Sequence, residues 1–200
     1  MITSGLLLPL VSFAVVATIT PGGATTLATA SGARFGFARS VPLLAGIAAG
    51  VSTLTGSVAG GLGSLLVAFP EIEIWIRVAG TAYLAWLAWR IMRLGAPGDA
   101  GDATAAPLGL AAGLALLWLN PKAWTMAVAA ASTYSGIAAG PFLLALTMGA
   151  VFGGAAAISL TLWCAGGSWL SRILRTDRQW RIVNCALGAM LAASIIPMWL

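Results

Sequence analysis

Long apolar stretches alternate with short clusters of charged residues along the whole chain. The longest stretch without a charged side chain, residues 123–171, has 49 residues, and Gly140-Pro141 divides it. An apolar helix of about 20 residues crosses a bilayer, so this stretch has room for two transmembrane helices. The whole pattern predicts six spans, near residues 4–32, 41–68, 72–92, 107–132, 142–168 and 180–199.

The apolar stretches are continuous rather than alternating, which favours transmembrane helices over the strands of a barrel. Hydrophobic residues make up 60% of the 200 residues and charged residues only 8%, against about 25% charged residues in soluble domains. This composition excludes a soluble globular domain and a disordered chain. We therefore predict an all-α membrane protein with a single transmembrane domain over residues 1–200.

Basic residues are concentrated in alternate connections between the predicted spans. Connections 1–2, 3–4 and 5–6 hold two, two and four Arg residues, whereas the ends and the other connections hold only Arg77. Cytoplasmic loops of membrane proteins are rich in Lys and Arg. We therefore expect these three connections in the cytoplasm and both termini outside. The net charge of +5 then reflects topology, and no nucleic-acid partner is expected.

Landmarks of the first half of the chain recur in the same order in the second half. Thr20-Pro21-Gly22 lies within the first span and Asn120-Pro121-Lys122 within the fourth, with the two prolines 100 residues apart. Pro42 begins the second span much as Pro141 begins the fifth. With three spans per half, the second copy enters the membrane from the opposite side, as in the inverted repeats of secondary transporters. We predict repeats over about 1–98 and 99–200; the alternative is coincidence in a chain rich in Gly and Pro.

Each proline motif pairs a helix-capping residue with a proline, a combination that often begins a helix. Within a span, it predicts a broken helix whose second half presents backbone N–H groups and a positive dipole end at bilayer depth. Two such ends at one cavity would bind a carboxylate; the alternative is a pair of kinks that serve helix packing. The candidate substrate-binding residues are Thr20, Pro21, Gly22, Gly23, Thr25, Asn120, Pro121 and Lys122.

Lys122 is the one charged residue well inside a predicted apolar span. Burying a lysine at the centre of a bilayer costs on the order of 3 kcal/mol, so its ammonium should face a partner or a polar cavity. The alternative is that the side chain extends to the membrane interface. The nearby Trp118 and Trp124 either line a pocket or pack, and glycine pairs such as Gly46/Gly50 indicate close helix packing.

The residues available for chemistry argue against an enzyme. The chain has no His, and no Asp or Glu lies deep within a predicted span, so side chains for acid–base catalysis are lacking. Cys164 and Cys185 lie in separate apolar stretches and form neither a CxxC motif nor a disulfide framework. We expect no enzymatic activity, no metal and no cofactor.

Several motifs resemble those of the lysine exporter family, also called the LysE/RhtB or homoserine/threonine exporter family. They are TPGG at 20–23, Gly32 with Arg34-Phe35-Gly36, AGTAYLAWLAWRIMR at 79–93 and LNPKAW at 119–124. The resemblance covers essentially the whole chain. It implies a bacterial inner-membrane exporter of amino acids or their derivatives, driven by the proton-motive force. Gly23 and Ala24 depart from the Pro and Asn that the family usually has after TPG, which leaves the substrate open.

The hypothesis that follows is a secondary transporter that exports amino acids by alternating access of two inverted repeats. One alternative is a six-helix membrane electron carrier, for which the two cysteines would have to serve. A second alternative is a channel or packing subunit, which would tolerate loss of Lys122. The expected partners are an amino-acid substrate and the lipid bilayer, with a homodimer through the Gly-rich faces as a further expectation.

Overall fold

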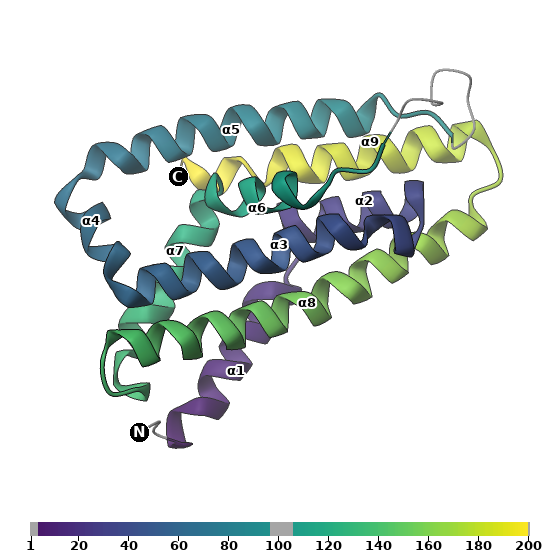
Figure 1. Cartoon of the computed structure of the whole chain (residues 1–200). Helices are drawn as coiled ribbons and strands as arrows, with labels where there is room; N and C mark the ends of the chain where they lie inside the picture. The colour runs from purple at the N-terminus through teal and green to yellow at the C-terminus, as the bar shows by residue number, and fades with distance from the viewer. Residues whose placement is uncertain (1–3, 97–105, 200) are drawn as a thin grey trace.

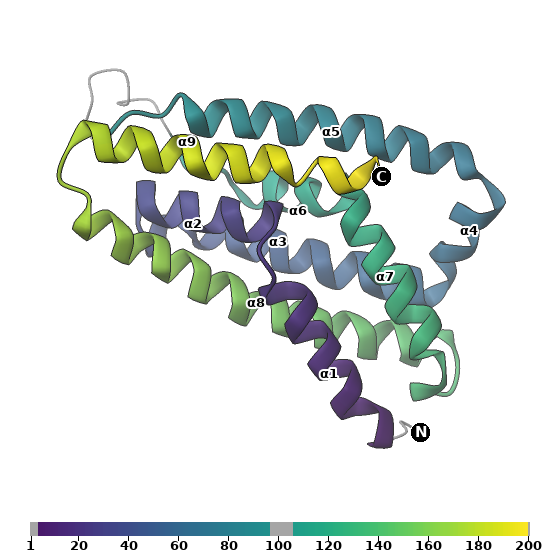
Figure 2. The same ribbon diagram turned by 180° about the vertical axis from the view of Figure 1, so that it is seen from behind.

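The computed structural model describes residues 4–96 and 106–199, which form helices joined by short turns. Figures 1 and 2 show an elongated bundle in which the longer helices run side by side. Over the described residues, the all-α prediction is confirmed. The α-helices are α1 (Ser4–Ile19), α2 (Gly23–Phe35), α3 (Phe37–Ser57), α4 (Gly63–Ala68), α5 (Pro70–Met92), α6 (Leu110–Trp118), α7 (Pro121–Thr133), α8 (Pro141–Ile173) and α9 (Asp177–Ala193).

Three segments of the described chain are each long and apolar enough to cross a membrane: Phe37–Leu62, Pro141–Ile173 and Asp177–Met198. The helices α1 and α2 add a fourth if they are taken together as one bent span. The helix α5 is long enough but carries Glu71, Glu73 and two arginines, and α6 and α7 have only 9 and 13 residues. Length and composition therefore support a multi-pass membrane protein, and the full set of six spans stays a prediction.

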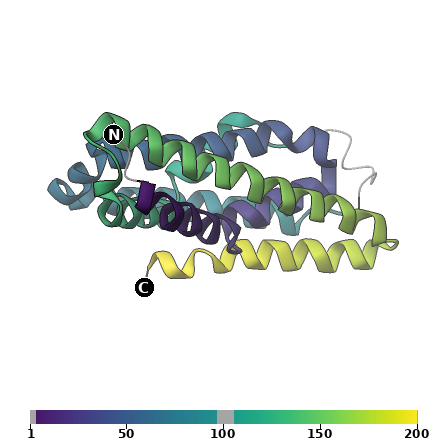
Figure 3. The same cartoon turned by 90° about the horizontal axis from the view of Figure 1, so that it is seen from below.

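Large apolar side chains cover the outside of the bundle. Leu8, Trp75, Phe142 and Ile158 are each at least two-thirds exposed. Contiguous apolar surface of this kind is costly in water and suits contact with lipid. Seen from below, α9 lies along one side of the bundle and α3 along the other, with α1 and α2 between them (Figure 3). The core, and any internal site, therefore lies between helices whose outer faces are suited to contact with a bilayer.

Both predicted helix breaks are present. The helices α1 and α2 meet at an angle of 56°, with Thr20, Pro21 and Gly22 between them, and α6 ends at Trp118 just before α7 begins at Pro121. Both breaks lie in the middle of the bundle (Figure 2). A proline at the first position of a helix lacks the N–H that would have no partner there, which explains why α7 begins at Pro121.

A further break in the second predicted span was not expected from the sequence. The helix α3 passes into a short π-helix over Val58–Leu62, where Gly61 has a φ of +124°. Only glycine adopts such a backbone readily, and the chain continues from there into α4. Pro42 also lies within α3, which begins at Phe37, rather than at the start of the span.

Glycines bring the helices into close backbone contact in the half of the bundle that holds the C-terminal end of α2. A Cβ atom added to Gly32 would lie 2.1 Å from the carbonyl oxygen of Cys164, and one added to Gly167 would lie 2.1 Å from that of Thr29. Gly46 and Gly113 hold α3 against α6 in the same way. The expectation that glycine pairs mark close helix packing is therefore confirmed at Gly46.

The same end of the bundle carries the basic connections and several interhelical hydrogen bonds. Arg34 donates to the carbonyl oxygen of Gly95, Asn184 donates to that of Leu94 at 2.7 Å, and Ser168 donates to that of Gly32 at 3.0 Å. The ends of α2, α5 and α8 and the start of α9 meet here, on the right of Figure 1. The described parts of the predicted cytoplasmic connections thus share one end of the bundle, which we call the basic end; residues 97–105 of connection 3–4 lie outside the described residues.

Candidate functional site

The first helix break is built from backbone and small side chains. Gly22 caps α2 with an extended backbone (φ −173°, ψ −169°). Its N–H donates to Thr25 Oγ1 at 2.8 Å, and this hydroxyl donates back to the Gly22 carbonyl oxygen at 3.0 Å. Thr25 is buried. The start of α2 is therefore fixed without a side chain at positions 22 and 23, and the absence of a side chain at Gly22 leaves room on the side that faces Lys122.

The second helix break adds a polar side chain and a cation. The buried side chain of Asn120 caps α7 by accepting a hydrogen bond from the backbone N–H of Lys122 at 3.0 Å. Pro121 occupies the first position of the helix, and Lys122 follows it. Such a cap satisfies one of the free N–H groups in the first turn. It also fixes the backbone from which the Lys122 side chain projects.

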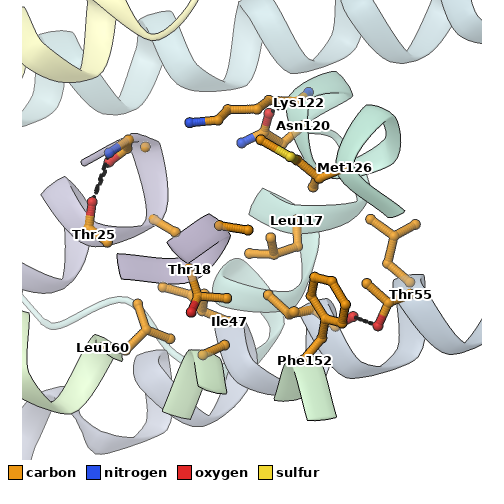
Figure 4. Close-up of a pocket in the computed structure, with 18 of the residues that line it drawn as sticks. Thr18, Thr25, Ile47, Thr55, Leu117, Asn120, Lys122, Met126, Phe152 and Leu160 are labelled. Atoms are coloured by element: carbon orange, nitrogen blue, oxygen red, sulfur yellow. Dashed lines mark hydrogen bonds between the residues drawn. The ribbon is translucent and has the colours of Figure 1, made fainter. Parts of the chain in front are cut away.

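The side chain of Lys122 crosses from the second break to the first. A Cβ atom added to Gly22 would lie 3.4 Å from Lys122 Nζ, so the ammonium is next to the backbone at the start of α2. Figure 4 shows the side chain extended from α7 above Asn120 toward the segment that holds Thr25. The two proline motifs, 100 residues apart in the sequence, are therefore in contact.

The Lys122 ammonium and its surroundings would attract an anion. Within the described residues, its ammonium has neither a hydrogen bond nor an ion pair; the ion pair found there joins Arg77 and Glu73 on α5 at 2.6 Å. The N-termini of α2 and α7 both carry a partial positive charge, of the same sign as the ammonium. A carboxylate between the three would be attracted by all of them.

Two cavities meet at this centre. The first has about 730 Å³ of space free of protein atoms and is lined by parts of α1, α2, α3, α6, α7 and α8. The second, of about 1220 Å³, lies toward the N-terminal end of α5 and the C-terminal end of α9. Gly22, Lys122 and Met126 line both cavities. The ammonium therefore lies at the boundary between them.

All eight residues predicted to form the site line at least one of these cavities. Gly22 and Lys122 line both; Pro21 and Pro121 line the second only. The residues that line only the first are Thr20, Gly23, Thr25 and Asn120. The geometry thus gathers the predicted set, while its role in binding stays a prediction.

The apolar wall of the first cavity was not identified from the sequence. It comes mainly from α3 and α8, with Ile47, Val51 and Leu54 on one helix and Phe152 and Leu160 on the other. In a chain that is 60% hydrophobic, these positions are not distinguished by composition from residues that face lipid. Only the breaks carried a local signal, because a capping residue followed by Pro, and a Lys beside it, are unusual within a span.

Other residues that the sequence singled out take structural roles. Trp118 and Trp124 form an edge-to-face pair with ring centroids 5.7 Å apart, and Trp124 donates to the Trp118 carbonyl oxygen; neither lines the two cavities. Tyr83 donates to the Ala112 carbonyl oxygen at 3.0 Å. Cys164 and Cys185 are free thiols outside the lining of both cavities.

A cationic centre between two cavities, inside a bundle with an apolar exterior, is an arrangement typical of membrane transport proteins. A family model described as LysE type translocator matches residues 15–193, and the chain belongs to this family. Membership assigns the protein to the efflux of amino acids and similar small molecules, as the sequence motifs indicated. No curated protein and no solved structure matches the chain.

Proposed function

We propose that this protein is a secondary carrier that exports amino acids across the bacterial inner membrane and binds the substrate carboxylate at Lys122. The observation that carries the proposal is the ammonium of Lys122 beside Gly22, without a partner in the described chain and between two helix N-termini. A charge-assisted hydrogen bond to a carboxylate would be stronger than one between neutral groups. The carboxylate is common to all α-amino acids, so this contact recognises the class.

The proposal includes six spans arranged as two inverted repeats. The bent pair α1–α2 corresponds to α6–α7, α3 to α8, and α5 to α9. Contacts between corresponding partners support this pairing: α3 packs along α8, and α5 packs along α9. In an inverted repeat, the second half of each broken helix points to an opposite side of the membrane while its N-terminus stays at the centre.

Equivalent contacts differ between the two ends of the bundle, which supports alternating access. At the basic end, α2 touches α8 backbone to backbone at Gly32 and Gly167. The helix α7 is the counterpart of α2, yet it meets α3 through larger side chains, among them Leu54 and Trp124. The proposed conformation is therefore closed at the basic end. If α2 moved away from α8 and α7 packed tightly against α3 instead, the basic end would open and the opposite end would close.

Transport assays test the proposal directly. Cells that overproduce the protein and are preloaded with radiolabelled amino acids should release them faster than control cells, with a rate that saturates as the internal concentration rises. An uncoupler that collapses the proton-motive force should slow this release. A rate that rises in proportion to concentration would instead identify a channel, and a rate equal to that of control cells would contradict the proposal.

The closed basic end offers a test of alternating access with a matched control. In Gly167→Ala, the new methyl group would meet the Thr29 carbonyl oxygen at 2.1 Å and force α2 away from α8, whereas nothing lies within 4 Å of a Cβ at the neighbouring Gly166. Cys164, which is fully buried in the same contact, reports the opening. In a Cys185→Ser background, we expect Gly167→Ala to make Cys164 react faster with a thiol reagent and to slow export by about 10-fold. Gly166→Ala should change neither rate, and equal rates in the two variants would contradict the assignment of this contact as a gate.

A further inference from the structure

The side-chain chemistry of the first cavity indicates which amino acids would fit it. Among the residues that the structure describes, Lys122 is the one charged residue in the lining of this cavity. Ile47, Phe152 and Leu160 lie across the cavity from the second helix break (Figure 4). Together with Val51 and Leu54, which also line the cavity, they supply an apolar wall. The cavity thus combines one cationic position with a region suited to an apolar group.

We infer that the cavity selects neutral amino acids with apolar side chains, such as leucine and valine, over those with charged side chains. This inference rests on the proposed function, because it places the substrate carboxylate at Lys122. The rest of the substrate then lies against the wall from α3 and α8.

A substrate side chain with either a positive or a negative charge would be unfavourable in this cavity. A lysine or arginine side chain would bring a second cation near Lys122 with no Asp or Glu in the lining to balance it. A glutamate side chain would need a second cation, and the lining supplies only one. Burial of an unpaired charge in apolar surroundings costs several kcal/mol, so the cavity discriminates by exclusion as well as by fit.

The hydroxyl groups of the cavity suit the substrate ammonium. Thr18, Thr20 and Thr55 each donate to the carbonyl oxygen of the residue four positions earlier in the chain, at 2.8, 2.6 and 2.7 Å. Their protons are therefore used, and their oxygens keep the capacity to accept a hydrogen bond. An ammonium has only donors to offer and matches such groups.

A substrate panel with the purified wild-type protein in liposomes tests the inference. We expect leucine and valine to be transported at least about 10-fold faster than lysine or glutamate at equal concentration. Transport of either charged amino acid at a rate equal to or above that of leucine would overturn the inference and leave the proposed export function intact. Transport of no amino acid would mean that the proposed function itself fails.

A variant of the apolar wall provides a second measurement. Val51→Phe narrows the first cavity, so leucine transport should fall by about 10-fold while alanine transport stays within about 2-fold. Val78→Phe makes the same change on α5 at a position that is 46% exposed and outside the cavities, and it should leave both substrates unaffected. An equal loss for leucine and alanine in correctly inserted Val51→Phe would count against selection by this wall.

Discussion

The two helix breaks occupy matching places in the chain but differ in chemistry. The break before α2 has glycine at positions 22 and 23 and is held by Thr25. The break before α7 has Asn120 as its cap and Lys122 in its first turn. The first break leaves space next to its helix N-terminus, and the second places an ammonium in that space.

This difference shows how a site for one anion can arise between two similar halves. A lysine at both breaks would place two like charges close together in a medium of low dielectric, which is strongly unfavourable. Glycine at both would leave only the helix dipoles, each equivalent to about half a charge. Lys122 facing Gly22 provides both a positive charge and the space for an anion. The first two variants below remove the charge and fill the space, respectively.

The largest effect is expected from removing the cation. Lys122→Met keeps a long, unbranched side chain but loses the charge, so the carboxylate would lose its charge-assisted hydrogen bond. We expect export to fall by about 100-fold in rate at low substrate concentration, as for a lost bond of 1.5–3 kcal/mol. Lys122→Arg restores the charge and should recover part of the activity.

Arg172→Met is a matched control for this variant, because it removes one cation from an exposed position at the end of α8. It should insert and export like the wild type. Quantitative immunoblotting of membranes separates loss of transport from loss of protein. Undiminished export by Lys122→Met at normal abundance would remove Lys122 from the site.

A smaller effect is expected from filling the space at the first break. Gly22 has an extended backbone, which alanine also adopts, so Gly22→Ala should fold. Its methyl group would lie 3.4 Å from Lys122 Nζ, where the carboxylate is proposed to bind. We expect the KM for export to rise by about 10-fold with a smaller change in maximal rate, because binding is affected before movement of the helices.

Gly154→Ala is the corresponding control, because no atom lies within 4 Å of a Cβ added at Gly154 in the long helix α8. Kinetic measurement of export over a range of substrate concentrations distinguishes the two variants. If Gly22→Ala kept the wild-type KM, the two breaks would not share one ligand.

The sequence predicted the features that depend on local chemistry. Pro121 after Asn120 marks a helix start wherever it occurs, and a lysine in an apolar stretch demands compensation. The contact between Gly22 and Lys122 is tertiary: it depends on the packing of helices 100 residues apart, and the inverted repeat offered only an indirect expectation of it. The apolar wall had no local signal at all.

Two features of the structure could not be predicted from the local sequence. The π-helix at Val58–Leu62 interrupts a stretch without charges, where only the Gly60-Gly61 pair was available to mark a break. Trp180 lies near the start of the last predicted span, a position typical of tryptophans at the membrane interface. It is nevertheless only 6% exposed and packs inside the bundle. A tryptophan near a span end suits either environment, and the helix face on which it lies depends on the neighbouring helices.

The smallest effect is expected from the cap of the second break. Asn120→Ala removes the acceptor for the Lys122 backbone N–H and should cost about 1 kcal/mol of stability. It would also loosen the backbone that directs Lys122 toward Gly22, so export should fall by about 3-fold.

Thr176→Ala is the matched control, because it removes the equivalent side-chain cap of α9, which accepts from the Gln179 backbone N–H at the basic end. Thermal unfolding in detergent should show similar destabilisation of both variants, whereas export should fall only in Asn120→Ala. If export fell equally in Asn120→Ala and Thr176→Ala, Asn120 would act through stability alone. The second break would then contribute the charge of Lys122 to the site, but the rigid start of α7 would have no separate role in transport.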